Sequence, residues 1–183
     1  MVEQIKAEYG RDNVEVEWLP YLLRPDMPEQ GQPLPSYVQQ KRGQTEPRLK
    51  QMAAAGGLDF IQHEHSPNPR RAHECTEYAR EMGKHEAFHK IVFRKLYGED
   101  KDIHDWAELR DAANEAAGLD PDDMQRRVEA GEYREAVDSL IAEAQAIGVQ
   151  GVPFYIVNRK YGISGAQPID VFRRAISISQ QAQ

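Results

Sequence analysis

A proline at the entrance to a strand is the feature that most limits what this chain can fold into. The segment "GVQGVPFYIVNRKYGISGAQP", residues 148–168, places Pro153 directly before an apolar run. Proline has no backbone N–H to donate to a sheet, so Pro153 belongs at the start of a strand or at a sheet edge. The runs "PFYIVN" and "YGIS" are joined by about three residues, which predicts a β-hairpin. After it, "PIDVFRRAI" predicts an amphipathic helix with Ile169, Phe172 and Ile176 facing inward.

Strand character elsewhere is confined to one segment near the start of the chain. Residues 14–18, "VEVEW", alternate apolar side chains with glutamates, and this period of two is typical of a strand with one polar face. Residues 2–9 predict a helix that ends at Gly10, and residues 24–36 carry four prolines and a glycine, which predicts a loop. We expect residues 14–18 to join the hairpin in a small mixed sheet covered by helices.

Between these parts the sequence is helical. Asp120 before Pro121 is a clear helix start, because an aspartate cap and a proline in the first turn both favour that terminus. A short extended piece at residues 58–62 interrupts the series. The expected helices span residues 46–55, 69–82, 84–97, 104–117, 121–130 and 132–147.

Charge and hydropathy exclude several classes of partner. The formal net charge is −7 over 183 residues, whereas a nucleic-acid surface needs clustered lysine and arginine. No apolar run approaches the roughly 20 residues of a membrane helix. The opening "MVEQIKAEYG" has neither the basic start nor the apolar middle of a signal peptide. We therefore expect a cytoplasmic protein that binds neither nucleic acid nor membrane.

The chain contains a single cysteine, Cys75. Residues 1–183 can therefore hold no intrachain disulfide, no Cys-x-x-Cys pair and no multi-cysteine zinc site. Cys75 lies in an expected helix between His73 and Glu77, where a buried packing role is favoured over a nucleophilic one, although His73 could lower its pKa. We expect no dithiol turnover from the chain as given.

Two histidine patterns raise the possibility of a metal site. "HEAFH", residues 85–89, fits the H-E-x-x-H pattern in which two histidines on a helix grip zinc. A catalytic zinc needs a third protein ligand, and the sequence shows none in the extended protease pattern. His63 and His65 are spaced for a metal only if the segment is extended, and a solvated loop is favoured. We therefore expect no bound metal.

Four quoted segments, in order along the chain, together resemble one family. They are "VEVEWLPYLLRPDMPEQG", "NPRRAHECTEYAREMGKHEAFH", "GLDPDDMQRRVEAGEY" and "GVQGVPFYIVNRKYGISGAQPIDVFRRAI". The chain resembles DsbA-like thioredoxin-fold proteins, specifically the FrnE-like branch, with Pro69 where the family's Asn-Thr-x-x-Ala-His motif has threonine. The resemblance implies an α/β thioredoxin-like fold with an inserted all-helical domain. The implied bounds are residues 1–27 and 131–183 for the thioredoxin-like domain and 28–130 for the helical insertion.

The main departure from the family concerns its N-terminal strand and Cys-x-x-Cys helix. This chain opens at what looks like the end of that helix, so we expect either a start upstream of Met1 or a shortened relative without dithiol chemistry. The strand missing from the expected fold would lie between residues 14–18 and 154–158. We expect these two strands to pair directly, to borrow a strand from another chain as in a homodimer, or to leave the chain only marginally stable.

The resemblance implies a thiol–disulfide oxidoreductase that binds an extended peptide or another thiol or disulfide substrate. Its loop would hold a cis Val152–Pro153 peptide bond, with the Val152 backbone pairing with the peptide in strand-like fashion. Gly151, which has no side chain, would leave the approach of the peptide to the loop unobstructed, and Phe154 would pack behind the loop. No catalytic residue can be named, and whether this chain is itself an enzyme stays open.

Two alternatives remain open. The related 2-hydroxychromene-2-carboxylate isomerases and kappa-class glutathione transferases share the helical insertion. In such an enzyme, glutathione would be the cofactor, held by Asn68, Val152 and the segment of Ser164, Gly165 and Ala166. The other alternative is a non-catalytic module that uses the Val-Pro loop to hold extended peptides. Two cysteines in the missing segment would favour the oxidoreductase, and a single serine would favour the glutathione enzyme. A segment with neither would favour the binding module.

Overall fold

The computed structural model describes residues 1–181 and contains the C-terminal hairpin. Strand β3 (Phe154–Val157) pairs antiparallel with β4 (Tyr161–Ser164), with Phe154 opposite Ser164 and Val157 opposite Tyr161. The turn between them places Asn158 and Arg159 at φ 49° and 56°, the left-handed region that tight hairpin turns need. The predicted hairpin is confirmed.

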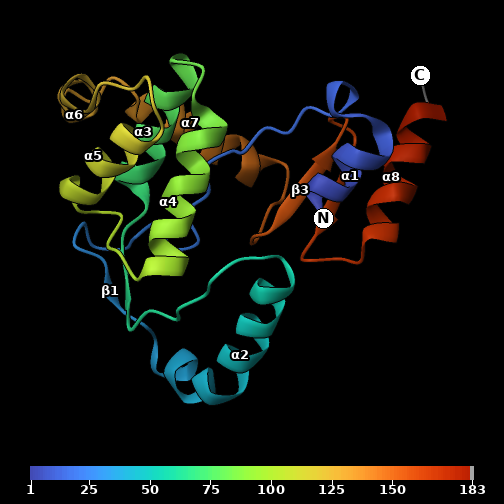
Figure 1. Cartoon of the computed structure of the whole chain (residues 1–183), viewed down its shortest axis with the longest axis horizontal. Helices are drawn as coiled ribbons and strands as arrows, with labels where there is room; N and C mark the ends of the chain where they lie inside the picture. The colour runs from blue at the N-terminus through green and yellow to red at the C-terminus, as the bar shows by residue number, and fades with distance from the viewer. Residues whose placement is uncertain (182–183) are drawn as a thin grey trace. The chain divides into compact units, whose positions relative to one another are not determined.

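Two helices pack with this hairpin (Figure 1). The ring of Tyr155 on β3 meets Phe172 of α8 (Ile169–Gln181) edge to face, with ring centroids 4.8 Å apart. Arg173 of α8 donates through Nε to Glu8 of α1 (Val2–Tyr9) at 2.9 Å. The shared core is formed by Ile5, Ile163, Phe172 and Ala175.

The expectation of a mixed sheet that includes residues 14–18 is wrong. Among residues 1–181, β3 and β4 pair only with each other, and residues 14–18 belong to no strand. Val14 is nonetheless extended (φ −123°, ψ 101°) after a short 3-10 turn η1 (Arg11–Asn13), and it packs against the hydrophobic core of the hairpin. Alternation sets which side chains face the core, but a strand also needs a neighbour to accept its hydrogen bonds.

The chain divides into two compact units. Unit 1 comprises Met1–Leu23 and the residues from Leu140 onward, and it holds the hairpin with α1 and α8. Unit 2 comprises Arg24–Ser139 and is largely helical. The domain bounds expected from the resemblance, 27/28 and 130/131, stay a prediction.

Unit 2 is built from helices around one core. Its elements are β1 (Gln32–Pro33), α2 (Ser36–Ala55), β2 (His65–Ser66), α3 (Arg70–Glu81), α4 (His85–Glu99), α5 (Trp106–Glu115) and α6 (Pro121–Glu129), and α7 (Arg134–Ala146) runs from unit 2 into unit 1. The core includes Cys75, Tyr78, Phe88, Leu109 and Met124, which are almost wholly buried. Asp120 caps α6 as expected, because its carboxylate accepts from the backbone N–H of Asp122 at 2.9 Å and of Asp123 at 3.1 Å.

The ends of α3 to α7 agree with the sequence-based bounds to within two residues, whereas α2 does not. It begins at Ser36, ten residues before the expected start at residue 46. Gly43 and the interior Pro47 weaken the helical pattern there, and no residue of α2 is buried. The expected extended piece at 58–62 forms no strand; instead, the short β1 and β2 pair with each other.

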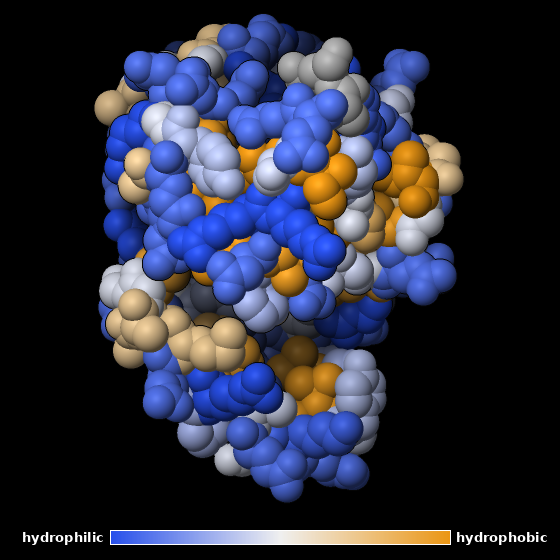
Figure 2. All heavy atoms as spheres, turned by 90° about the vertical axis from the view of Figure 1, so that its right-hand side faces the viewer, coloured by the Kyte–Doolittle hydropathy of each residue, from blue (hydrophilic) through white to orange (hydrophobic). Residues whose placement is uncertain are grey.

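The exposed surface is mainly polar. Figure 2 shows hydrophilic residues over most of one face, with hydrophobic residues gathered in separate patches. Among residues 1–181, no helix is both long enough and apolar enough to cross a membrane.

Candidate functional site

The loop before β3 is the candidate site of unit 1. The Val152–Pro153 peptide bond is cis, the isomer that the resemblance implies. The carbonyl oxygen of Pro153 accepts a hydrogen bond from the backbone N–H of Gly165 at 2.9 Å. Because β4 ends at Ser164, this bond brings the segment of Ser164, Gly165 and Ala166 beside the loop.

The backbone of the loop is open to a partner. Val152 is 51 % exposed, and a Cβ built on Gly151 meets nothing within 4 Å. Among the described residues, no backbone hydrogen bond joins Gly151 or Val152 to another residue, and the edge of β3 away from β4 pairs with no strand. Unsatisfied N–H and C=O groups beside a strand edge are the groups that an added peptide strand uses.

Two contacts fix where this loop begins. The hydroxyl of Tyr21 donates to the carbonyl oxygen of Val149 at 3.0 Å, and the backbone N–H of Val149 donates to Ala144 at 3.0 Å. Sequence reasoning missed Tyr21, because a contact between residues so far apart in the chain leaves no local pattern.

Phe154 and Ile156 lie on the face of β3 opposite Tyr155. A Cβ built on Gly162 would come within 2.8 Å of the Phe154 ring, so glycine at this position of β4 makes room for that ring. Phe154 is half-buried, and its predicted packing behind the loop stays a prediction. Ile156 remains 45 % exposed.

Asn68 lies in unit 2, and its amide is used within that unit. Its Nδ2 donates to the carbonyl oxygens of Met27 at 3.0 Å and Pro28 at 3.2 Å, and its Oδ1 accepts from the N–H of Arg70 at 2.9 Å. Asn68 therefore holds the proline-rich loop against the start of α3. Glutathione binding by this residue stays a prediction, and it would have to compete with these bonds.

Cys75 is fully buried, which confirms its predicted packing role. Burial raises the pKa of its thiol far above the ordinary range, and the neighbouring Glu74 carboxylate raises it further. The thiolate is the reactive form of cysteine, so this side chain is a poor nucleophile.

The "HEAFH" segment forms the start of α4, with the rings of His85 and His89 stacked at 6.0 Å. Within residues 1–181, no three histidine, cysteine, aspartate or glutamate side chains are grouped to hold a metal. Burial, and then the neighbouring His85, lower the pKa of His89 to about 4. The absence of zinc stays a prediction for measurement.

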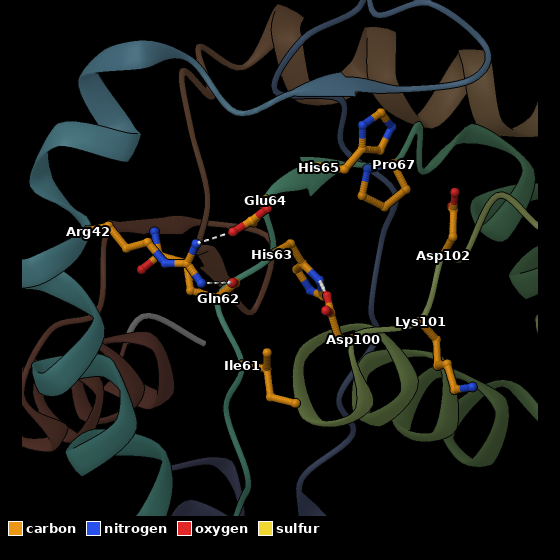
Figure 3. Close-up of a pocket in the computed structure, with 10 residues that line it drawn as sticks. All are labelled: Arg42, Ile61, Gln62, His63, Glu64, His65, Pro67, Asp100, Lys101 and Asp102. Carbon is orange, nitrogen blue, oxygen red and sulfur yellow. Dashed lines mark hydrogen bonds and ion pairs between the residues drawn. The ribbon is translucent and has the colours of Figure 1, made fainter.

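Unit 2 also contains a hollow of about 460 Å³ that sequence reasoning missed (Figure 3). Arg42 of α2 reaches Glu64 at 3.2 Å and the carbonyl oxygen of Gln62 at 2.9 Å, and His63 contacts Asp100 through Nδ1. The contacts of Arg42 tie α2 to the segment that follows it. We assign the hollow no ligand.

Comparison with known proteins decides the family. Residues 1–177 match the family model of the DSBA-like thioredoxin domain. The chain belongs to this family. It is 31% identical over 179 residues to the uncharacterized protein YwbO of Bacillus subtilis (strain 168), across 96% of this chain and 87% of that protein.

A solved structure supports the same assignment. The probable DsbA oxidoreductase SCO1869 from Streptomyces coelicolor superposes with a TM-score of 0.89 at 28% identity, covering 100% of this chain and 82% of that one. The chain therefore has the DsbA-like thioredoxin fold, mostly helical with a small sheet.

Proposed function

We propose that this DsbA-like chain is the substrate-binding part of a thiol–disulfide oxidoreductase. In this proposal the loop of Gly151, Val152 and Pro153 holds an extended peptide beside a dithiol that residues 1–183 do not contain. The observation that carries it is the exposed, unpaired backbone of Gly151 and Val152 next to the open edge of β3. The FrnE-like branch, a cytoplasmic location and a homodimer are further predictions of the same account.

In this proposal the loop positions the substrate and the dithiol carries out the exchange reaction. In thiol–disulfide exchange, a thiolate attacks one sulfur of a disulfide, a new S–S bond forms, the old one breaks, and the leaving sulfur departs as a thiolate. Cys75 cannot supply the attacking thiolate, because burial raises its pKa and no second cysteine can resolve a mixed disulfide. What this chain offers is main-chain pairing that positions the substrate.

The glutathione-dependent alternative would use the same loop. Its expected segment lies beside Pro153, but the N–H of Gly165 already donates to Pro153, and the carbonyl oxygen of Ser164 accepts from Gln167 at 2.9 Å. No contact in the structure favours glutathione over a peptide, so we use it as a competitor in the test.

A binding measurement with a matched pair of variants tests the proposal. The probe is a fluorescein-labelled insulin B chain, reduced and alkylated so that no disulfide chemistry can occur, followed by fluorescence anisotropy. Gly151→Val adds a branched side chain where the structure leaves open space, and Gly43→Val does the same on α2. Both variants should therefore fold.

The proposal predicts saturable binding that Gly151→Val weakens at least about tenfold, since the side chain blocks the approach to the Val152 backbone. Gly43→Val should bind like the wild-type chain. Equal binding by Gly151→Val and wild type would overturn the assignment of the loop. Complete displacement by millimolar glutathione would favour the glutathione-dependent alternative.

A further inference from the structure

Helix α2 contributes no residue to the core of unit 2. None of its residues is buried, and in Figure 1 it lies apart from the helices α3 to α6. Its half-buried side chains mark the side that faces the rest of unit 2; they include Val38, Arg42, Glu46 and Ala53. Helices in proteins gain most of their stability by packing one face against other parts of the fold. The remaining side of α2 is therefore a surface on which a partner could stabilise the helix.

The charge of α2 is opposite to that of the chain as a whole. The formal net charge of the chain is −7, so acidic residues dominate it. Residues 30–58, in contrast, contain one carboxylate, Glu46, and four cations, which are Lys41, Arg42, Arg48 and Lys50. Glu46 is already paired with Arg42 at 3.0 Å and with Lys50 at 2.8 Å. Within the part of the chain that the structure describes, Lys41 and Arg48 form no ion pair with a carboxylate.

These two unpaired cations lie in one exposed stripe along α2. Lys41 and Arg48 are seven residues apart, which is two turns of helix or about 10 Å along its axis. Tyr37 lies one turn before Lys41, Met52 lies one turn after Arg48, and these two residues are 66% and 54% exposed. We call these four residues the α2 stripe. Exposed aromatic rings, methionines and arginines are enriched where proteins bind one another.

The spacing of the α2 stripe indicates the chemistry of a partner. A helix that lies along α2 would meet Lys41 and Arg48 with two carboxylates that are also seven residues apart. Apolar side chains four residues outside these carboxylates would meet Tyr37 and Met52. An anionic membrane surface fits less well, because a helix that lies in a membrane interface needs a broad apolar face, whereas two cations separate the apolar residues of this stripe.

We propose that the α2 stripe is a docking site for an acidic amphipathic helix of another protein. The two ion pairs would select the partner and speed its association, and the apolar ends would remove surface from water. This site lies in unit 2 and does not use the loop of Gly151, Val152 and Pro153, so it can hold or fail independently of the proposed function.

Two designed peptides test the docking by fluorescence anisotropy. Both are fluorescein-labelled, alanine- and glutamine-rich helices of equal length. The acidic peptide carries leucine, glutamate, glutamate and leucine at the spacing of the α2 stripe, and the control peptide has glutamine in place of both glutamates. We expect saturable binding of the acidic peptide, at least about fivefold tighter than that of the control peptide at about 0.05 M salt. The difference should shrink at about 0.5 M salt, because salt screens exposed charges.

A matched pair of variants locates the site. Lys41→Gln with Arg48→Gln removes both cations from exposed positions, and glutamine is a good helix former, so this variant should fold. Lys84→Gln with Arg174→Gln changes the net charge equally at exposed positions outside α2. We expect the first variant to bind the acidic peptide at least about fivefold more weakly than the wild-type chain. The second variant should bind it like the wild-type chain.

The apolar ends of the α2 stripe distinguish docking from general charge attraction. Tyr37→Gln with Met52→Gln keeps both cations and should weaken binding of the acidic peptide at least about threefold, since less apolar surface is buried. Unchanged affinity in this variant would overturn the proposal, because the attraction would then depend on charge alone.

Two further results would also overturn the proposal. One is equal binding of the acidic peptide by the wild-type chain and by Lys41→Gln with Arg48→Gln, or equal binding of the two peptides by the wild-type chain. The other is binding to phosphatidylglycerol vesicles that requires Lys41 and Arg48, with no binding of either peptide, which would assign the α2 stripe to a membrane surface.

Discussion

Lys95 offers the clearest test of how unit 2 is stabilised. Its side chain is only 5% exposed, and its ammonium donates to Glu108 at 2.9 Å and to Asp111 at 2.6 Å. Burial alone would lower the pKa of Lys95, but the hydrogen bonds to Asp111 and Glu108 outweigh it and raise that pKa. The buried charge is therefore acceptable only while its two carboxylates are present.

The two ways of breaking this group should have unequal costs. Glu108→Gln with Asp111→Asn leaves the ammonium buried without an anion, which costs about 3–5 kcal/mol in fully buried pairs. Asp111 is 66% exposed, and the new amide oxygens can still accept hydrogen bonds from the Lys95 ammonium. We therefore expect the double variant to lose about 2–3 kcal/mol of unfolding free energy. Lys95→Met keeps the packed stem and removes the charge, and Glu108 retains Lys101 at 3.3 Å, so we expect a change within about 1 kcal/mol.

Urea unfolding at pH 7, followed by the fluorescence of Trp106 in a Trp18→Phe background, measures both costs in unit 2. Lys95 lowers the pKa values of the Glu108 and Asp111 carboxyl groups. The difference in unfolding free energy between the wild-type chain and the double variant should therefore be present above about pH 4, and it should vanish at lower pH as these carboxylates are protonated. An equal loss of stability in Lys95→Met and in the double variant would refute the reasoning, because the lost contacts would then matter more than the stranded charge.

Three further outcomes follow from the buried cysteine, the histidine pair and the core. Residues 1–183 should not accelerate insulin reduction by dithiothreitol, and Cys75→Ser should behave identically; activity that disappears in Cys75→Ser would contradict this. Protein purified without added zinc should contain less than one equivalent by metal analysis, whereas one zinc per chain that is lost in His89→Ala would prove the metal prediction wrong. Phe88→Ala, at a fully buried position, should lower the free energy of unfolding by about 3–5 kcal/mol in urea, and a loss below about 1 kcal/mol would show that the core repacks.

Sequence reasoning succeeded where local chemistry decides the structure. Asp120 and Pro121 mark the start of α6, because a cap acts on the next two or three residues. The hairpin of β3 and β4 likewise follows from a short connection between two apolar runs. The hairpin register then explains why Ser164 comes beside the loop at Pro153, although the loop itself was recognised through resemblance.

The failures share one cause, which is dependence on distant partners. Residues 14–18 have the alternation of a strand, but the described chain provides no neighbouring strand. The sequence of α2 has too little apolar periodicity to predict that the helix begins at Ser36. The roles of Asn68, as a clamp on the proline-rich loop, and of Arg80, as a link to His85, depend on contacts between different elements, so no single stretch of sequence reveals them.

The most direct test of the central claim is to observe the loop itself during binding. Titration of the ¹⁵N-labelled chain with unlabelled, reduced and alkylated insulin B chain would report every backbone amide. The account predicts saturable shifts at Gly151, Val152 and along β3, at the concentrations at which anisotropy detects binding. Saturable shifts confined to unit 2, with the signals of Gly151 and Val152 unmoved, would contradict it.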